Sequence, residues 1–250
     1  MRFALISDIH ANLPALEAVL ADSDARGDLD AVYHLGDLVG YAPWPNETVA
    51  LLRGRGIAGV AGNYDSTTAA DYKHCGCRYE DPEQEALSRI SYSWTCEHVT
   101  AETARYLRAL PFRIDVRPDG GHVVGPRLIL IHGNPVLNTV YWTEERPDAF
   151  CMEMSRVLGA KAGDVIAFGH THLPWHRTVD GIHFVNAGSV GRPKDGDPRA
   201  GYAIVEFGDD VTVEFVRVLY DVAHAARGVR ESELPDAFAD YLEKGGVLVS

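Results

Sequence analysis

Two histidines, His170 and His172, follow a short apolar run at residues 165–168 and a single glycine. The run predicts a buried strand, and on an extended backbone the i, i+2 spacing places both imidazoles on one side. In α/β sheets, ligands and metals gather beyond the carboxyl ends of the strands. Two imidazoles directed to one point at such an end are well suited to hold a cation.

Polar side chains of metal-ligand type follow four further predicted strands. They are Asp8 and His10 after Phe3–Ser7, Asp37 after Ala31–Leu35, Asn63 after Ile57–Ala61, and His132 after Arg127–Ile131. Because parallel strands end at the same edge of a sheet, we expect these groups to converge with His170 and His172. One such cluster alone is more often ordinary local structure, but five in order are not expected by chance.

The combination of donors indicates a catalytic metal site rather than a structural one. Carboxylates, imidazoles and one amide oxygen, without thiolates, suit Mn, Fe, Zn or Ni. The seven side chains exceed the needs of one open site and would serve two divalent metal ions that share a carboxylate. Such a pair of ions could bind hydroxide at neutral pH and hold both oxygens of a displacement at phosphorus.

The elements that position these residues alternate between strand and helix through the first three strands, which predicts an α/β unit with a mostly parallel sheet. Glycines on either side of Asp37 permit a tight turn with the carboxylate at its tip. Further strands are predicted at 112–116, 175–179, 183–185, 202–207 and 211–219, and helices after Pro14, at 46–54, at 148–159 and after Asp221.

Residues 66–110 have a different pattern, with aromatic residues among polar ones and helix starts at Pro82 and Thr100. We interpret this stretch as a mostly helical insertion, either a lid or an oligomer contact. Ordinary helices that cover a sheet face explain the pattern equally well.

Composition restricts the class of protein. The 250 residues, 46% hydrophobic and 24% charged, are typical of one globular domain. A net charge of −13 argues against a nucleic-acid binder, whereas anionic substrates stay open because divalent ions reverse the sign locally. Without a recognisable membrane span or signal peptide, we expect a cytoplasmic protein with no membrane partner.

The four cysteines match neither a zinc-finger pair nor a CxxC redox pattern. Cys75 and Cys77 form a CxC beside His74, and Cys96 and Cys151 stand alone. We expect structural or surface thiols.

Taken in order, these motifs resemble those of the calcineurin-like metallophosphoesterase superfamily over residues 1–190 at least. They are Asp8-x-His10, Gly36-Asp37-x-x-Gly40, Gly62-Asn63-x-Asp65, His132 and Gly169-His170-Thr171-His172. Three further stretches of sequence are similar to those of the compact bacterial and archaeal phosphoesterases. They lie around Asn12-Leu13-Pro14, Gly40-Tyr41-x-Pro43 and Asn186-Ala187-Gly188-Ser189.

The resemblance implies a four-layer αββα sandwich, two mixed β-sheets face to face with helices outside, as a single domain over residues 1–250. It also implies the ligands: Asp8, His10 and His172 for one ion, Asn63, His132 and His170 for the other, and Asp37 as the bridge. By analogy, a hydroxide bridging the two ions attacks phosphorus without a covalent enzyme intermediate.

One position departs from the superfamily pattern. Many members have a histidine after the amide ligand, near the leaving group, and the next acid orients it; here Tyr64 and Asp65 stand there. A phenol with a pKa near 10 is a poorer proton shuttle than imidazole at neutral pH. Good leaving groups, such as aryl esters and phosphoanhydrides, are therefore favoured. Tyr64 either lines the phosphate pocket or only packs, and Asp65 would then brace the loop.

Two further residues are candidates for substrate contact. Arg192, after a Gly-Ser-Val-Gly turn, could bind phosphate through its planar donors, although a solvated loop arginine explains the sequence as well. Asn12 is either a helix-start residue or a pocket donor.

The leading hypothesis is a two-metal phosphoesterase acting on a small phosphate mono- or diester. One alternative is a hydrolase of dinucleoside polyphosphates or nucleotide pyrophosphates. An alternative of another class is a metal-binding scaffold or regulatory subunit with little turnover, against which the complete ligand set argues. Homo-oligomerisation stays open, and the acidic composition disfavours a nuclease.

Overall fold

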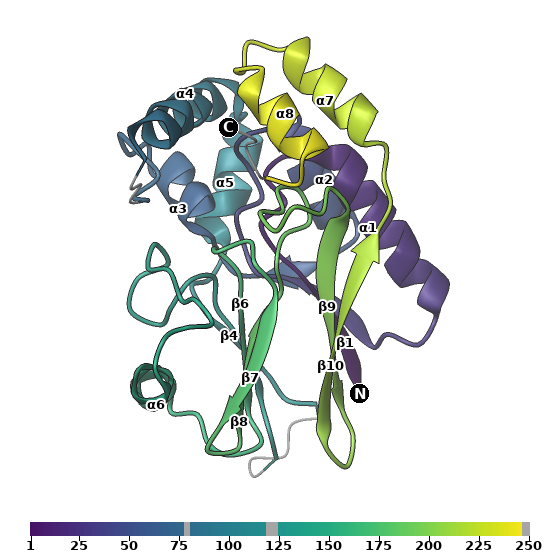
Figure 1. Ribbon diagram of the computed structural model, residues 1–250, viewed down its shortest axis with the longest axis vertical. Coiled ribbons are helices and arrows are strands. Elements are labelled where there is room, and N and C mark those ends of the chain that lie inside the picture. The colour runs from purple at the N-terminus through teal and green to yellow at the C-terminus, as the bar shows by residue number, and fades with distance from the viewer. Residues whose placement is uncertain (78–80, 119–124, 247–250) are drawn as a thin grey trace.

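The computed structural model describes residues 1–77, 81–118 and 125–246, which form ten strands and eight helices (Figure 1). In chain order these are β1 (Arg2–Ile6), α1 (Leu13–Arg26), β2 (Ala31–His34), α2 (Pro45–Gly54), β3 (Ala58–Gly59), α3 (Asn63–Ala69), α4 (Pro82–His98), α5 (Ala101–Ala109), β4 (Ile114–Val116), β5 (Leu128–Leu130), α6 (Asp148–Leu158), β6 (Val165–Phe168), β7 (Trp175–Val179), β8 (Ile182–Asn186), β9 (Ala200–Phe207), β10 (Val211–Val218), α7 (Val222–Arg230) and α8 (Ala237–Glu243).

The strands form two mixed sheets of five. The first sheet has the order β10-β9-β1-β2-β3 and the second sheet the order β4-β5-β6-β8-β7. Neighbours among β1, β2 and β3 are parallel, as are β5, β6 and β8, while β9, β10, β4 and β7 pair antiparallel with their neighbours. The predicted α/β fold with two mixed sheets is therefore confirmed.

The two sheets pack face to face and helices cover their outer sides. Between the sheets lies an apolar layer that contains Leu5, Leu35, Leu130, Val165 and Val185. A second cluster joins the first sheet to α1, α7 and α8, and a third joins the second sheet to α6. The layers therefore follow the order helix, sheet, sheet, helix, with α6 beside the second sheet in Figure 1.

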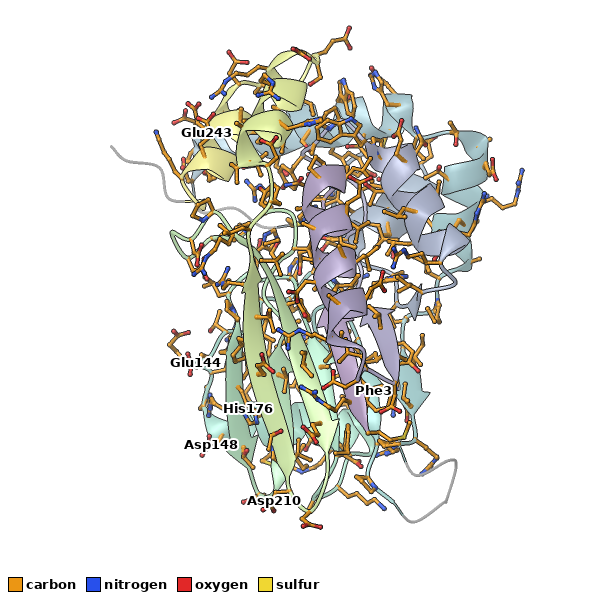
Figure 2. The ribbon with its side chains drawn as sticks, turned by 90° about the vertical axis from the view of Figure 1, so that its right-hand side faces the viewer. Phe3, Glu144, Asp148, His176, Asp210 and Glu243 are labelled. Atoms are coloured by element: carbon orange, nitrogen blue, oxygen red, sulfur yellow. The ribbon has the colours of Figure 1, made fainter. Side chains whose placement is uncertain are left out.

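Most helices gather at one end of the sandwich. In the side view of Figure 2, Glu243 of α8 lies at this end and Asp210, in the turn between β9 and β10, lies at the other. The loops that leave the parallel strands of both sheets reach the helical end, so their polar residues meet there (Figure 1). Among the described helices, none combines the length and the apolar character needed to cross a membrane.

The segment 66–110 contains the two predicted helices, α4 and α5. Pro82 occupies the first turn of α4, where its missing N–H costs nothing, and the Thr100 hydroxyl accepts a bond from the Thr103 N–H at the start of α5. Helix α5 packs against α2 and α3, and α4 against α3. Residues 78–80, within the predicted insertion, lie outside the described residues.

The third strand is shorter than the predicted Ile57–Ala61, since β3 covers Ala58–Gly59 alone. The Val60 N–H still donates to His34 O at 3.1 Å, but the Ala61 N–H turns to Pro111 O at 2.9 Å. The chain thus leaves the sheet early and carries Asn63 to the first position of α3.

Candidate metal centre

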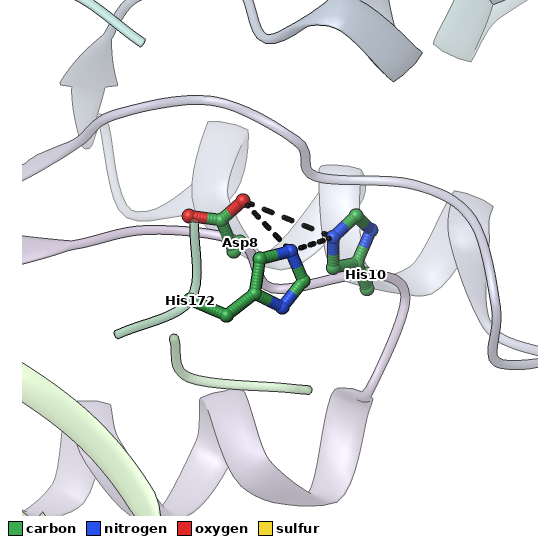
Figure 3. A group of neighbouring side chains, drawn as sticks. All are labelled: Asp8, His10 and His172. Carbon is green, nitrogen blue, oxygen red and sulfur yellow. Dashed lines mark hydrogen bonds and ion pairs between the residues drawn. The ribbon is translucent and has the colours of Figure 1, made fainter. Parts of the chain in front are cut away.

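Two groups of buried acids and histidines lie where the strands of both sheets end. One comprises Asp8, His10 and His172 (Figure 3), and the other comprises Asp37, His132 and His170. Within each group the candidate ligand atoms lie within 4.8 Å of one another. Each group takes residues from loops of the first sheet and from the ends of β5 or β6 in the second, so it forms only when the sheets pack together.

Asp8 has one carboxylate oxygen in use and one without a donor. Its Oδ2 accepts bonds from Ser7 Oγ at 2.7 Å and from the His170 backbone N–H at 2.9 Å. Its buried Oδ1 has no hydrogen-bond partner and lies 3.3 Å from His172 Nε2 and 3.8 Å from His10 Nε2. Because an unsatisfied buried carboxylate oxygen is costly, this atom fits a cation ligand.

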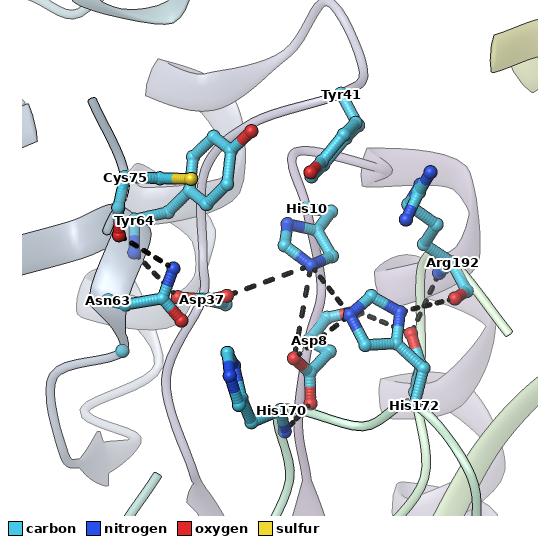
Figure 4. A network of polar contacts seen from close by, with 12 residues as sticks. Asp8, His10, Asp37, Tyr41, Asn63, Tyr64, Cys75, His170, His172 and Arg192 are labelled. Carbon is cyan, nitrogen blue, oxygen red and sulfur yellow. Dashed lines mark hydrogen bonds and ion pairs between the residues drawn. The ribbon is translucent and has the colours of Figure 1, made fainter. Parts of the chain in front are cut away.

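The imidazoles of His10 and His172 present two acceptors to each other. His10 Nδ1 donates to Val39 O at 3.1 Å, and His172 Nδ1 donates to Arg192 O at 2.5 Å. Since a carbonyl only accepts, each neutral ring carries its lone pair on Nε2. The two Nε2 atoms lie 3.2 Å apart (Figure 4), and a cation between them would remove the repulsion.

His132 of the second group faces the nearby Asn63. His132 Nδ1 donates to Leu35 O at 2.7 Å. The Asn63 amide nitrogen donates to Cys75 O at 3.3 Å and to Cys77 Sγ at 3.1 Å, so its Oδ1 faces His132 Nε2 at 3.1 Å. A metal ion would be coordinated by both of these facing atoms.

Asp37 belongs to the second group and also lies close to the first. Its Oδ1 accepts a bond from the Tyr64 backbone N–H at 2.8 Å. Its Oδ2 is 3.4 Å from His132 Nε2 and 3.8 Å from His10 Nε2. On the far side, the buried Nε2 of His170 has no hydrogen-bond partner. This position suits Asp37 to a ligand shared between two ions.

The backbone at these residues is held in a costly conformation. Five of them have left-handed φ values: +50° at Asp8 and at His10, +52° at Asp37, +64° at His172 and +66° at His170. For a residue with a side chain, each such conformation costs about 1 kcal/mol or more. Strain of this kind gathers at functional sites, where it directs side chains to a common point.

Burial and charge set the protonation of the four histidines. Burial lowers the pKa of His10 and of His170 to about 3, and lowers that of His172 well below its usual value. Burial alone would lower the pKa of His132, but the nearby carboxylates of Asp37 and Asp8 outweigh it and raise this pKa to about 9. Three imidazoles are thus neutral at pH 7, as metal coordination requires.

These observations show that the side chains fit two divalent cations. Comparison with known families agrees, since residues 1–210 match the calcineurin-like phosphoesterase superfamily domain. The chain belongs to the calcineurin-like phosphoesterase superfamily. This confirms the resemblance on which the ligand prediction was based.

Relatives place the chain in the compact branch of the superfamily. It is 32% identical over 261 residues to the uncharacterized protein MJ0912 of Methanocaldococcus jannaschii, with 97% of each chain covered. It is 27% identical over 206 residues to phosphodiesterase YfcE of Escherichia coli K12, covering 82% of this chain and 88% of YfcE. A crystal structure of a metallophosphoesterase from Sphaerobacter thermophilus is 32% identical, with a TM-score of 0.74 and coverage of 98% and 99%.

Tyr64, where many superfamily members have histidine, directs its hydroxyl away from the candidate ligands (Figure 4). The hydroxyl lies 3.3 Å from Ser88 Oγ of α4, and the ring fills the space beside Gly40, where a Cβ would clash with it. Burial raises the pKa of Tyr64 well above 10. The Tyr64 ring lines the pocket beside the candidate ligands while its hydroxyl packs against α4, and contact with substrate stays a prediction.

Asp65 and Asn12 have structural partners. The Asp65 carboxylate accepts bonds from the Leu38 N–H at 2.8 Å and the Gly62 N–H at 2.9 Å, which braces the loop that holds Asp37. Asn12 Oδ1 accepts a bond from the Ala15 N–H at 3.2 Å, which is the helix-start role.

A small, partly open pocket lies against the candidate ligands and is lined by residues that sequence reasoning missed. Arg192, predicted for substrate contact, lines it together with Lys194, Tyr41, Tyr141 and Cys77. The Tyr141 ring stacks on His170 at 4.5 Å between centroids. The sequence signal for Lys194 is its position two residues after the candidate Arg192. Nothing in the loop sequence marks Tyr141.

Proposed function

We propose that the protein is a phosphoesterase that hydrolyses a small phosphate ester with two divalent metal ions. The supporting observation is that two buried groups of acids and histidines direct polar atoms to shared points, with Asp37 close to both. Asp8, His10 and His172 would hold one ion, Asn63, His132 and His170 the other, and Asp37 would be shared. The nitrogen and oxygen donors suit Mn, Fe, Zn or Ni.

When bound, divalent ions supply Lewis acidity toward a phosphoryl group and acidify water. The chain's own residues prepare the site for this chemistry. Carbonyl groups of Val39, Leu35 and Arg192 fix three imidazoles with Nε2 directed inward. The buried rings of Tyr41 and Tyr64 exclude water from one wall of the cavity.

Hydrolysis of p-nitrophenyl phosphate and bis(p-nitrophenyl) phosphate tests this proposal. Protein freed of metal with EDTA is expected to be inactive, and added manganese should restore turnover of at least one ester. Asp37→Asn should lower kcat/KM by about 10²-fold or more, since it removes the shared charge. Asp209→Asn, at an exposed turn, is the matched control and should leave kcat/KM unchanged.

The scaffold alternative predicts a different outcome. Such a protein would bind manganese tightly and show no turnover of either ester or of a panel of phosphorylated metabolites. That result would overturn the proposed phosphoesterase activity even if both ions bind.

A further inference from the structure

Two cations, Arg192 and Lys194, stand on the wall of the cavity that opens onto the candidate metal ligands. Both come from the loop between β8 and β9. Arg192 is only 7% exposed and Lys194 is half-buried, so both have lost much of their water. Partly desolvated cations require a compensating anion.

Within residues 1–77, 81–118 and 125–246, neither side chain donates a hydrogen bond or forms an ion pair. The nearest acids in sequence do not compensate them, because Asp195 pairs with Arg217 and Asp197 pairs with Arg199. The chain has 36 acidic residues and a net charge of −13, so carboxylates are abundant. Two neighbouring cations without a carboxylate as ion-pair partner indicate a site for an anion from outside the chain.

The Arg192 side chain is held ready for such an anion. Its guanidinium carbon lies 4.0 Å from the centre of the Tyr41 ring and 4.9 Å from that of Tyr241, which confines it between two aromatic faces. Its backbone is fixed as well, since its N–H donates to Ser189 Oγ at 2.8 Å and its carbonyl accepts from His172. The N–H edge stays open for bidentate binding of a phosphate.

The electrostatics of Lys194 support the same conclusion. Burial, together with the neighbouring charge of Arg192, lowers the pKa of Lys194 to about 8. An anion bound beside Lys194 would stabilise its ammonium form and raise this pKa again. Asp8 and Asp37 are the acids that attract Lys194 across the cavity, and in the proposed function both are occupied as metal ligands.

We propose that Arg192 and Lys194 form a subsite for a second phosphate of the substrate, so that the protein prefers phosphoanhydrides to simple monoesters. This inference rests on the proposed function, which assigns the scissile phosphate to the metal ions. The two ions compensate that first phosphate, and the two cations of the loop then match the charge of a second.

The chemistry of an anhydride also fits the residues present. In its hydrolysis, the oxygen of water bonds to the scissile phosphorus, and the bond from that phosphorus to the bridging oxygen breaks. The bridging oxygen departs with the electron pair as part of the second phosphate, and a proton of the water is released to solvent or product. An anionic phosphate leaves without a proton donor, and the Tyr64 hydroxyl, directed to Ser88, is not placed to be one.

Binding of two non-hydrolysable anions tests the subsite directly. Methylenediphosphonate has two phosphonates and methylphosphonate has one, and each is titrated calorimetrically into protein with manganese in excess over the titrant. Wild type should bind the diphosphonate about tenfold or more tightly than the monophosphonate. Lys194→Gln and Arg192→Gln should each reduce this ratio about fivefold or more, while methylphosphonate affinity changes less than about threefold.

Two further variants serve as controls. Lys194→Arg keeps the charge and should retain the wild-type ratio, which separates charge loss from misfolding. Arg199→Gln removes an exposed arginine of the same loop and should leave the ratio unchanged. A parallel titration of metal-free protein in EDTA should show that diphosphonate binding is weakened by Lys194→Gln there too.

Two outcomes would overturn the inference: equal loss of affinity for both anions in Lys194→Gln and Arg192→Gln, or no loss for either. Equal loss would mean that the cations bind the scissile phosphate itself. If manganese fails to support hydrolysis while the affinity ratio changes as expected, the proposed function fails. The subsite for a second phosphate then stands on its own.

Discussion

Each of these candidate ligands uses one polar atom inside the protein and directs the other to a shared point. Asp8 does so with its two carboxylate oxygens, and His10, His132 and His172 do so with their two ring nitrogens. The internal bond selects the tautomer and the orientation before any ion arrives. In the proposed site, metal affinity would therefore depend on backbone carbonyls as well as on the ligands themselves.

Manganese affinity should rise with pH because of His132. Its raised pKa of about 9 means that the ring is protonated at neutral pH in the metal-free protein, and an ion must displace this proton. Affinity is expected to increase between about pH 6.5 and 8, by up to about tenfold per pH unit. Calorimetry in buffers of different ionisation enthalpy measures both affinity and proton release. A pH-independent affinity would contradict the assignment of His132 as a ligand.

Tyr64→Phe should leave turnover nearly intact. The hydroxyl bonds to Ser88 of α4, so its loss should cost about 1 kcal/mol of unfolding free energy and change kcat/KM by less than about threefold. Urea unfolding and ester hydrolysis measure the two effects. A large loss of kcat at unchanged stability would show instead that the phenol acts on the substrate.

The loops after β2 and β3 approach each other so closely that only glycine fits at the contact. A Cβ on Gly62 would overlap the Asp37 carboxylate and backbone, and one on Gly36 would overlap the Gly62 backbone. The loop after β1 joins them, since the Asp8 N–H donates to Gly36 O at 3.0 Å. Three loops of one sheet therefore act as a single support.

Gly62→Ala tests this support. The added methyl should displace Asp37, destabilise the protein by about 1–3 kcal/mol and weaken manganese binding. Gly54→Ala, at the end of α2, is the control, because its Cβ meets nothing within 4 Å. Calorimetric titration with manganese compares the two variants. Equal affinities would show that Asp37 is not held by this contact.

Sequence patterns predicted the strands and the convergence of the seven candidate ligands because both follow local rules. An apolar run that ends in a polar residue marks a strand end, and parallel strands bring such ends together. Lys194 and Tyr141 could not be predicted in the same way, because their positions depend on long loops with no periodicity. The shorter β3 has a similar cause, since the partner of Ala61 is the distant Pro111.

At the scale of the whole molecule, the two proposed ions would connect the two sheets. Asp8, His10, Asp37 and Asn63 come from the first sheet, and His132, His170 and His172 follow strands of the second. Ions bound at both groups would therefore stabilise the packing of one sheet on the other.

Manganese should accordingly raise the melting temperature. At 100 times its Kd, a ligand that binds only the native state adds about 2.7 kcal/mol. For a chain of this size the increase in Tm is roughly 5–10 °C. Asp37→Asn should show a much smaller shift by scanning calorimetry, whereas Asp209→Asn should match wild type. An equal shift in Asp37→Asn would contradict a shared ligand.

The C-terminal helices extend the molecule beyond the family match, which ends at residue 210. Phe238 of α8 packs edge-on against Tyr41, and Tyr241 covers Arg192. Sequence patterns predicted these helices but not their packing against Tyr41 and Arg192, because both contacts join residues far apart in the sequence. We propose that residues 1–250 are one domain, with residues 66–110 as an insertion.

Anomalous diffraction from a crystal soaked in manganese would locate any bound ions and their ligands. Two peaks are predicted, one beside Asp8, His10 and His172 and one beside Asn63, His132 and His170, with Asp37 in contact with both. A well-occupied crystal with a single peak, or with His132 and His170 turned away from any ion, would contradict the account.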